Sequence, residues 1–251
     1  MAIKRKPLQG IANIIRFNWH FYLAALLGMA FIGLASYYLP TPFHYVALSV
    51  CLLVFIPLAI SLLVSFYVYD VSGLYNLSWL PNLHLKTILN INAGFDETSQ
   101  IIQHKFEHVQ LTIGDFYDER HHTELSIKRA RKALPPIAGT VRISTSQIPF
   151  SNCSFDYVIA ILSAHEIRNH DERVLFFKEL NRVLKPEGHI YVTEHLRDWK
   201  NFLAYSIGSF HFHAKKVWLQ TFVHSNLKVV QEIKINPFIT TFVLVPHGNT
   251  V

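Results

Sequence analysis

Two pairs of histidine and glutamate follow two apolar runs in the second half of the chain. His165 and Glu166 follow the first run, and Glu194 and His195 follow the second. A carboxylate can orient an imidazole as a general base for proton transfer. The pairs therefore predict His165 as a catalytic base, oriented by Glu166 or Glu194. His195 is the alternative base, and the other interpretation of each histidine is a polar residue that orders a loop.

The sequence contains 15 histidines, which raises the question of a metal site. The spacing of His165, Glu166 and His170 differs from the zinc-binding pattern H-E-x-x-H, because residues i and i+5 do not share a helix face. His211 and His213 offer two further imidazoles, but the aromatic residues around them favour an aromatic-rich surface segment. We therefore expect no metal site in this protein.

Apolar strand-like runs alternate with helical patterns after residue 86. This alternation predicts a parallel sheet with helices on both faces, closed by two antiparallel strands. Ligands bind at the carboxyl ends of the strands in such sheets, and both histidine–glutamate pairs fall there. The expected strands are Thr87–Asn92, His108–Ile113, Thr140–Ser144, Tyr157–Leu162, His189–Thr193, Leu227–Ile233 and Phe238–Val245. The expected helices are Glu97–Phe106, Thr123–Ala133 and Asp171–Leu184, with part of Asn201–Thr221.

The first third of the chain is much more apolar than the rest. Hydrophobic residues make up 51% of the sequence and charged residues only 16%, and Phe17–Tyr69 contains no Asp, Glu, Lys or Arg. Phe21–Leu39 and Tyr45–Tyr69 each reach the roughly 20 residues that span a bilayer as a helix. Pro40 and Pro42 force a break between them, so we expect two transmembrane helices in a hairpin. A cleaved signal peptide and an apolar core hairpin of a soluble protein are the alternatives.

Basic residues predict how this hairpin is oriented. Lys4, Arg5, Lys6 and Arg16 precede the first segment, and the loop between the segments has no basic residue. Basic residues favour the cytoplasmic side of a membrane, so the N-terminus is expected there. Two spans return the chain to the same side. The expectation is a multi-pass membrane protein whose domain, Asp70–Val251, is cytoplasmic.

The formal net charge of +6 suits an anionic membrane surface. Nucleic acid is the other partner that a basic chain suggests, and Lys128–Lys132 is the main basic cluster. That cluster lies on an expected helix without interleaved aromatic residues, which favours a solvated or lipid-facing helix. We therefore expect a lipid membrane as a partner and no nucleic acid.

The stretch Gln147–Glu194 carries a family resemblance. It reads QIPFSNCSFDYVIAILSAHE, then an amphipathic helix that ends in LKPEG, then a second apolar run. This order resembles the second half of class I S-adenosylmethionine-dependent methyltransferases of the type 11-like group. The resemblance covers about Lys86–Val245. It implies a Rossmann-like α/β fold with a seven-stranded sheet, here preceded by two transmembrane helices, and S-adenosylmethionine as the cofactor.

The resemblance also implies where the cofactor binds. The family places an acidic residue and three alternate glycines after the first strand, and this chain has NINAGFD at 90–96, in which only the central glycine is kept. An acidic residue after the second strand holds the ribose hydroxyls, and one after the third contacts adenine. The implied cofactor-binding residues are Asn90, Asn92, Gly94, Asp96, Asp115 and Ser144. A turn capped by Asp96 is the plain alternative for the loop.

Together these features predict a membrane-anchoring hairpin at 1–70, a connector at 71–85 and a methyltransferase-like domain at 86–251. The predicted enzyme methylates a lipophilic small molecule, such as a quinone, isoprenoid or lipid-like acceptor, on oxygen. The alternative is a catalytically degenerate membrane binding or scaffold protein, which the lost glycines favour. An open crevice beside Gly94 and Asp115 would support the enzyme, and a crevice filled by side chains would support the scaffold.

Overall fold

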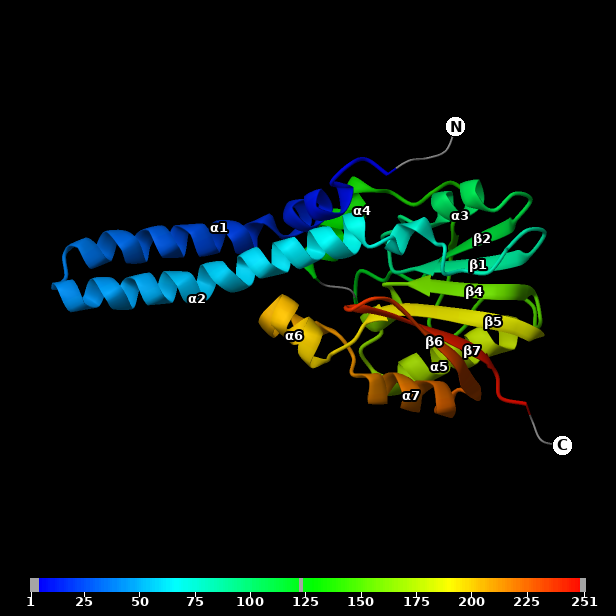
Figure 1. The fold of residues 1–251 in the computed structure, drawn as a ribbon. Helices are drawn as coiled ribbons and strands as arrows, with labels where there is room; N and C mark the ends of the chain where they lie inside the picture. The colour runs from blue at the N-terminus through cyan, green and yellow to red at the C-terminus, as the bar shows by residue number, and fades with distance from the viewer. Residues whose placement is uncertain (1–4, 122–123, 249–251) are drawn as a thin grey trace.

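A computed structural model describes residues 5–121 and 124–248 of the chain. Lys4 and Thr123, which belong to the expected basic start and to an expected helix, lie outside the described residues. The chain forms a long helical hairpin that projects from one end of an α/β domain (Figure 1). The hairpin and the strand ends therefore meet at one side of the molecule.

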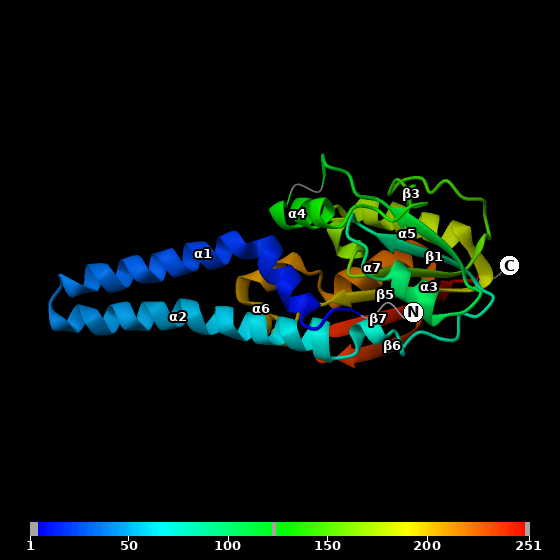
Figure 2. The same ribbon diagram turned by 90° about the horizontal axis from the view of Figure 1, so that it is seen from above.

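The hairpin consists of α1 (Gln9–Tyr37) and α2 (Thr41–Phe66), and α2 runs on into a π-helical turn at Tyr67–Val71. Both helices are long and apolar enough to cross a membrane, and no residue of their most apolar windows is buried within the protein. The two helices lie side by side along their length (Figure 2). Such outward-facing apolar side chains need an apolar surrounding, which a bilayer supplies.

The base of the hairpin is closed by contacts between its two helices. The carboxylate of Asp70 accepts hydrogen bonds from the backbone N–H groups of Gly10, over 2.7 Å, and Ile11, over 2.8 Å. A negative side chain at a helix start satisfies free N–H groups and favours the helix dipole. A Cβ at Gly10 would lie 2.4 Å from Cβ of Tyr69, so only glycine fits this close approach. Beyond it, Asn18 leaves helical geometry (φ −115°, ψ 15°) and kinks α1.

The domain contains a seven-stranded sheet in the order β3-β2-β1-β4-β5-β7-β6. Neighbours from β3 to β5 are parallel, and β7 is antiparallel to both β5 and β6. The predicted parallel sheet with an antiparallel ending is confirmed. The strands are β1 (Thr87–Asn92), β2 (Gln110–Asp115), β3 (Val141–Arg142), β4 (Phe155–Ile161), β5 (Leu184–His195), β6 (Leu227–Asn236) and β7 (Ile239–Pro246).

Helices cover both faces of the sheet (Figure 1). Phe176 of α5 and Phe222 of α7 are buried in the core on one face, and Ile102 of α3 is buried on the other, beside Leu77 and Leu83 of the connector. The helices of the domain are α3 (Ser99–Lys105), α4 (Leu125–Ala133), α5 (His170–Val183), α6 (Trp199–Tyr205) and α7 (Lys215–His224). A short 3-10 segment, Ser206–His211, follows α6.

The fifth strand begins earlier than the expected His189. Leu184 already pairs with Phe155 of β4, and Lys185 forms an ion pair with Asp156, with Nζ and Oδ1 3.0 Å apart. Gly188 makes the close approach possible, because a Cβ there would lie 2.9 Å from the Asp156 carbonyl oxygen. The sequence predicted that the strand begins only after Pro186 and Gly188, but pairing with β4 extends the strand through both residues.

Candidate active site

The loop after β1 is built around Gly94. Its backbone has φ +91°, in the left-handed region, and a Cβ added there would lie 2.8 Å from Cγ of Tyr117. The side-chain oxygen of Asn92 accepts a hydrogen bond from the Gly94 N–H over 2.9 Å, and its amide donates to the Gly114 carbonyl over 3.3 Å. Glycine is needed both for the backbone angle and for the contact with Tyr117. Asn92 thus holds the loop against β2.

Asn90 and Asp96 stabilise the start of α3. The Asn90 amide donates to the hydroxyls of Thr98, over 2.9 Å, and Ser99, over 2.7 Å. Oδ1 of Asp96 accepts from the backbone N–H groups of the same two residues, over 3.0 and 2.9 Å. Asp96 therefore caps the start of α3, which was the alternative interpretation of this loop. Oδ1 of Asn90 and Oδ2 of Asp96 are buried and have no hydrogen-bond partner among the residues that the structure describes.

Tyr117 and Arg131 fill the crevice between Gly94 and Asp115. Asp115 is buried at the end of β2, where Oδ1 accepts from the Tyr117 N–H over 2.9 Å and Oδ2 pairs with the Arg131 guanidinium. That guanidinium also lies 4.7 Å from the centroid of the Tyr117 ring. By the criterion set out from the sequence, this side-chain-filled crevice is the feature that supports a scaffold. Ser144, in contrast, lies in an exposed turn where its hydroxyl pairs with that of Ser146, and it does not line the crevice.

A cavity of about 190 Å³ lies at the carboxyl ends of β1 and β4. The first turns of α1 form its roof, where Phe17 meets the ring of Phe95 edge to face with centroids 5.5 Å apart. Glu97 fixes this roof by accepting from Gln9 and Asn13 of α1, each over 3.0 Å. The volume is below the roughly 300 Å³ at the small end of ligand pockets. The cavity is lined by Asn92, Phe95, Thr98, His165, His195 and Phe212, among others.

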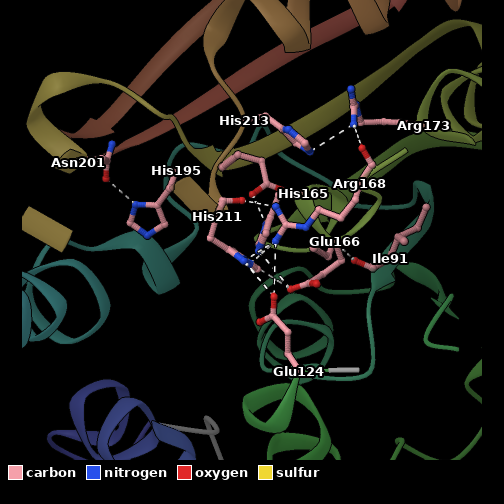
Figure 3. Close-up of polar contacts among 12 residues, drawn as sticks. Ile91, Glu124, His165, Glu166, Arg168, Arg173, His195, Asn201, His211 and His213 are labelled. Carbon is pink, nitrogen blue, oxygen red and sulfur yellow. Dashed lines mark hydrogen bonds and ion pairs between the residues drawn. The ribbon is translucent and has the colours of Figure 1, made fainter. Parts of the chain in front are cut away.

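His165, Glu166 and Glu194 come together at the ends of β4 and β5, as the sequence predicted. Nδ1 of His165 lies 2.7 Å from Oε2 of Glu194, and its Nε2 lies 3.4 Å from Oε1 of Glu166. The Glu194 carboxylate also accepts from the His165 backbone N–H over 3.2 Å. Figure 3 shows His211, from the segment after α6, reaching the same cluster. Sequence reasoning placed His211 on a surface and missed this contact.

The carboxylates decide the charge of this cluster. Burial alone would lower the pKa of His165, but the negative charges of Glu194 and Glu166 outweigh it and raise that pKa to about 10. Burial would raise the pKa of Glu166, but hydrogen bonds from His165 and His211 hold it well below its ordinary value. His165 is therefore an imidazolium at neutral pH. It can donate a hydrogen bond to an acceptor there, but it must lose a proton before it can act as a base.

His195 is held differently. Its Nε2 lies 2.9 Å from the Tyr69 hydroxyl, and its Nδ1 lies 3.0 Å from the side-chain oxygen of Asn201. Burial lowers the pKa of His195 to about 4, despite the opposing hydrogen bond with Asn201. The ring is therefore neutral, donates from Nδ1 to Asn201 and accepts from Tyr69 at Nε2. With both nitrogens engaged and Phe212 stacked on its face at 4.6 Å, His195 ties elements together.

The sequence and the fold of the domain both resemble those of known proteins. Residues 119–192 match the family model of a methyltransferase domain. Residues 119–192 therefore belong to a methyltransferase domain. A solved structure of an S-adenosylmethionine-dependent methyltransferase from Aquifex aeolicus is similar, with 14% identity, a TM-score of 0.52, and coverage of 75% of this chain and 97% of that chain. The family match supports the predicted family, enzyme class and cofactor class, and the solved structure confirms the predicted fold.

A second solved structure shows the same fold. It is the complex between the Haloferax volcanii Trm112 methyltransferase activator and a putative methyltransferase, with 13% identity and a TM-score of 0.52. The match covers 70% of this chain and 89% of that chain. No curated protein matches the sequence. At these identities the solved structures establish the fold, and the roles of individual residues rest on the geometry described above.

Proposed function

We propose that this protein is a membrane-anchored, S-adenosylmethionine-dependent methyltransferase that methylates an oxygen of a lipophilic small molecule, such as a quinone, isoprenoid or lipid-like acceptor. One observation carries the proposal. The cavity at the strand ends is lined by the loop after β1 and by His165, and its roof is the first part of the hairpin helix α1. The cofactor loop, the polar cluster and the anchor thus adjoin one space.

The residues after β1 and β2 fit the chemistry of the cofactor. When bound, S-adenosylmethionine supplies an electrophilic methyl group on a sulfonium centre. Gly94 allows close backbone approach, and Oδ2 of Asp96 is a buried acceptor still without a partner for an amino group. The carboxylate of Asp115 can accept from ribose hydroxyls once Arg131 releases it. Room for the cofactor therefore requires Tyr117 and Arg131 to turn out of the crevice.

The polar cluster serves the acceptor. His165 lines the cavity, and Glu194 orients its ring through Nδ1. In the charged state, Nε2 of His165 donates a hydrogen bond that can hold an acceptor bound as its oxyanion, which has already given its proton to solvent. Positioning of two reactants in a fixed geometry supplies much of the rate of such a transfer. His195 keeps the neighbouring wall of the cavity in place.

Two features support a lipophilic acceptor. An apolar groove of about 490 Å³ lies between α2 and α6, lined by Ile60, Val64 and Leu203 with the turn before β7. Large apolar side chains on α6 and the segment after it face outwards beside the hairpin, with Trp199 68% and Ile207 80% exposed. Apolar faces of this kind lie in the interface of a bilayer. Lipophilic molecules concentrate in the same layer.

Membrane topology is part of the proposal. Two spans and the basic residues before α1 favour a cytoplasmic N-terminus and a cytoplasmic domain. The test is maleimide labelling of intact cells with single cysteines in a Cys51→Ser/Cys153→Ser background. Pro42→Cys, exposed at the start of α2 near the tip of the hairpin, should react with an impermeant reagent, and Lys178→Cys, exposed on α5, should react only after permeabilisation. The opposite pattern would reverse the orientation.

The activity is tested with the purified full-length protein in detergent, labelled S-adenosylmethionine and a lipid extract of the host. We expect the label to appear in an extractable lipid, and calorimetry to show saturable cofactor binding. Asp115→Asn should weaken that binding, and Glu119→Gln, a nearby exposed acid, should leave it unchanged. If wild type and variants all fail to bind the cofactor, the enzyme proposal is wrong.

A catalytically inactive binding or scaffold protein is the second candidate, because Tyr117 and Arg131 fill the crevice. Tyr117→Ala separates the two functions. For an enzyme whose crevice opens on binding, this variant should bind S-adenosylmethionine more tightly than wild type, since the ring no longer has to move. For a scaffold, neither protein should bind it.

A further inference from the structure

We propose that His165, Glu166 and His211 form a binding site for one divalent transition-metal ion, with zinc as the best fit. The three side chains converge beyond the ends of β4 and β5 (Figure 3). His165 and Glu166 follow β4, and His211 comes from the segment after α6. No short sequence motif contains all three ligands, because His211 is remote in sequence from His165 and Glu166. The site reverses our expectation that the protein has no metal site.

The spacing of the ligand atoms suits a tetrahedral ion. Oε1 of Glu166 lies 3.4 Å from Nε2 of His165 and 3.6 Å from Nε2 of His211. All three ligand atoms lie within 4.8 Å of one another. Zinc binds nitrogen and oxygen at about 2.0–2.1 Å, so the ligands of a tetrahedral zinc site are separated by about 3.3 Å. Small side-chain adjustments bring the three atoms to that distance.

Both histidines have their other ring nitrogen held by a carboxylate. Nδ1 of His165 lies 2.7 Å from Glu194, and Nδ1 of His211 lies 3.1 Å from Glu124. Carboxylates in this position fix the ring and its tautomer, and leave Nε2 free to bind a metal ion. Here both Nε2 atoms face the same oxygen of Glu166. This matched arrangement is the one that metal-binding histidines adopt.

A divalent cation fits the charges around the cluster. Glu124, Glu166 and Glu194 contribute three negative charges, and Arg168 contributes one positive charge, with its Nη2 3.9 Å from Glu124. When both imidazoles give up a ring proton and bind an ion as neutral ligands, two negative charges are left without a partner. A single divalent ion at the point where the two Nε2 atoms meet Glu166 balances them. The ligand set of two histidines and one glutamate is one that zinc uses in enzymes.

Arg168 is the group that opposes the ion. Its guanidinium donates to the His211 carbonyl and contacts the ring, with Nη2 2.6 Å from Nε2 of His211. The Arg168 side chain is 42% exposed, so it can turn into solvent when the ion binds. Arg168→Ala removes this competing cation. The variant should therefore bind the ion more tightly than wild type.

Three protein ligands leave the fourth position of a tetrahedral site open. His165 also lines the cavity at the strand ends, so that position adjoins the space proposed for the acceptor. A metal ion lowers the pKa of a hydroxyl or water molecule bound to it. This last role rests on the proposed methyl transfer: in the metal-bound protein the ion would replace the Nε2 hydrogen bond of His165 in holding the acceptor oxygen, and would activate that oxygen without a free imidazole base. Metal binding itself does not depend on that activity.

The test is calorimetric titration of the chelator-stripped full-length protein in detergent with zinc chloride. We expect one ion per chain. His211→Ala and Glu166→Gln should weaken binding at least about 100-fold, and Glu124→Gln about 10- to 100-fold. Arg168→Ala should tighten it about fivefold, the effect of removing one like charge near the ion. His224→Ala, on the exposed side of α7, is the matched control and should bind as wild type does.

Cobalt provides a second readout that depends on coordination. The cobalt-loaded protein should show the visible absorption of a four-coordinate site, and His211→Ala should lose it while keeping its circular dichroism spectrum. Absence of saturable zinc binding to wild type overturns the proposal. The proposal is also overturned if His211→Ala and His224→Ala both bind zinc as tightly as wild type does. If the protein binds zinc but not S-adenosylmethionine, the metal-site proposal stands and only the methyltransferase proposal is wrong.

Discussion

The hydroxyl of Tyr69, at the end of the hairpin, donates a hydrogen bond over 2.9 Å to Nε2 of His195, at the end of β5. His195 is 3% exposed, and its other nitrogen is engaged by Asn201. The bond joins the second hairpin helix to the strand that also carries Glu194. Through this contact the hairpin and the candidate active site are directly connected.

Tyr69→Phe should destabilise the domain, because it leaves Nε2 of the buried His195 without a donor. The expected loss is about 1–3 kcal/mol in the free energy of unfolding, the usual cost of an unsatisfied buried polar group. Denaturant unfolding in detergent, followed by circular dichroism, measures it. Tyr67→Phe is the control, since Tyr67 is 39% exposed. Equal stability of the two variants would show that the Tyr69 bond contributes nothing.

Gly94→Ala should destabilise the loop after β1 for two reasons. The left-handed backbone disfavours a side chain by about 1–2 kcal/mol, and the new Cβ would meet the Tyr117 ring at 2.8 Å. The double variant Gly94→Ala/Tyr117→Ala removes the second cause only. We expect the alanine at 94 to cost less stability in the Tyr117→Ala background than in wild type, as measured by a double-mutant cycle. An identical cost in both backgrounds would contradict contact between the two residues.

The sequence predicted the sheet and the meeting of His165 with Glu194. Apolar runs and helical periods are local signals, and the carboxyl ends of neighbouring parallel strands must lie together. The same reasoning located Gly94 correctly at the first turn. These predictions succeeded because each depends on short stretches of chain and on one general property of parallel sheets.

Contacts between remote segments were not predictable in this way. Arg131 belongs to a basic cluster interpreted as solvated, but its guanidinium pairs with Asp115. His211 was assigned to a surface, and it reaches Glu166. The first turns of α1 were assigned to the anchor, but Gln9 and Asn13 bond to Glu97 of the domain. Each of these partners is chosen by tertiary packing, which leaves no periodic signal in the sequence.

The apolar side chains of α6 and the segment after it should lie in the membrane interface. In proteoliposomes, Ile207→Cys in a background without native cysteines should react more slowly with an impermeant maleimide than Lys178→Cys, because lipid covers residue 207. The two positions should react at similar rates after the protein is unfolded in guanidinium chloride, which removes the protection by lipid. Equal rates in proteoliposomes would show that this surface does not contact the bilayer.

The cluster of His165, Glu194 and Glu166 should make stability depend on pH. The pKa of His165 is raised from 6.5 to about 10 in the folded protein, so its contribution is complete below pH 6.5 and is lost as pH rises towards 10. The pKa of Glu166 is lowered from 4.5, so its contribution is present above pH 4.5 and is lost at more acidic pH.

The difference in melting temperature between wild type and His165→Gln should therefore be largest between pH 4.5 and 6.5 and shrink steadily above that range. Thermal unfolding in detergent with a chelator present measures this difference without a contribution from bound metal. His224→Ala, an exposed histidine of α7, should show no such trend. A difference for His165→Gln that grows with rising pH would mean that the folded protein holds this imidazole in its neutral form.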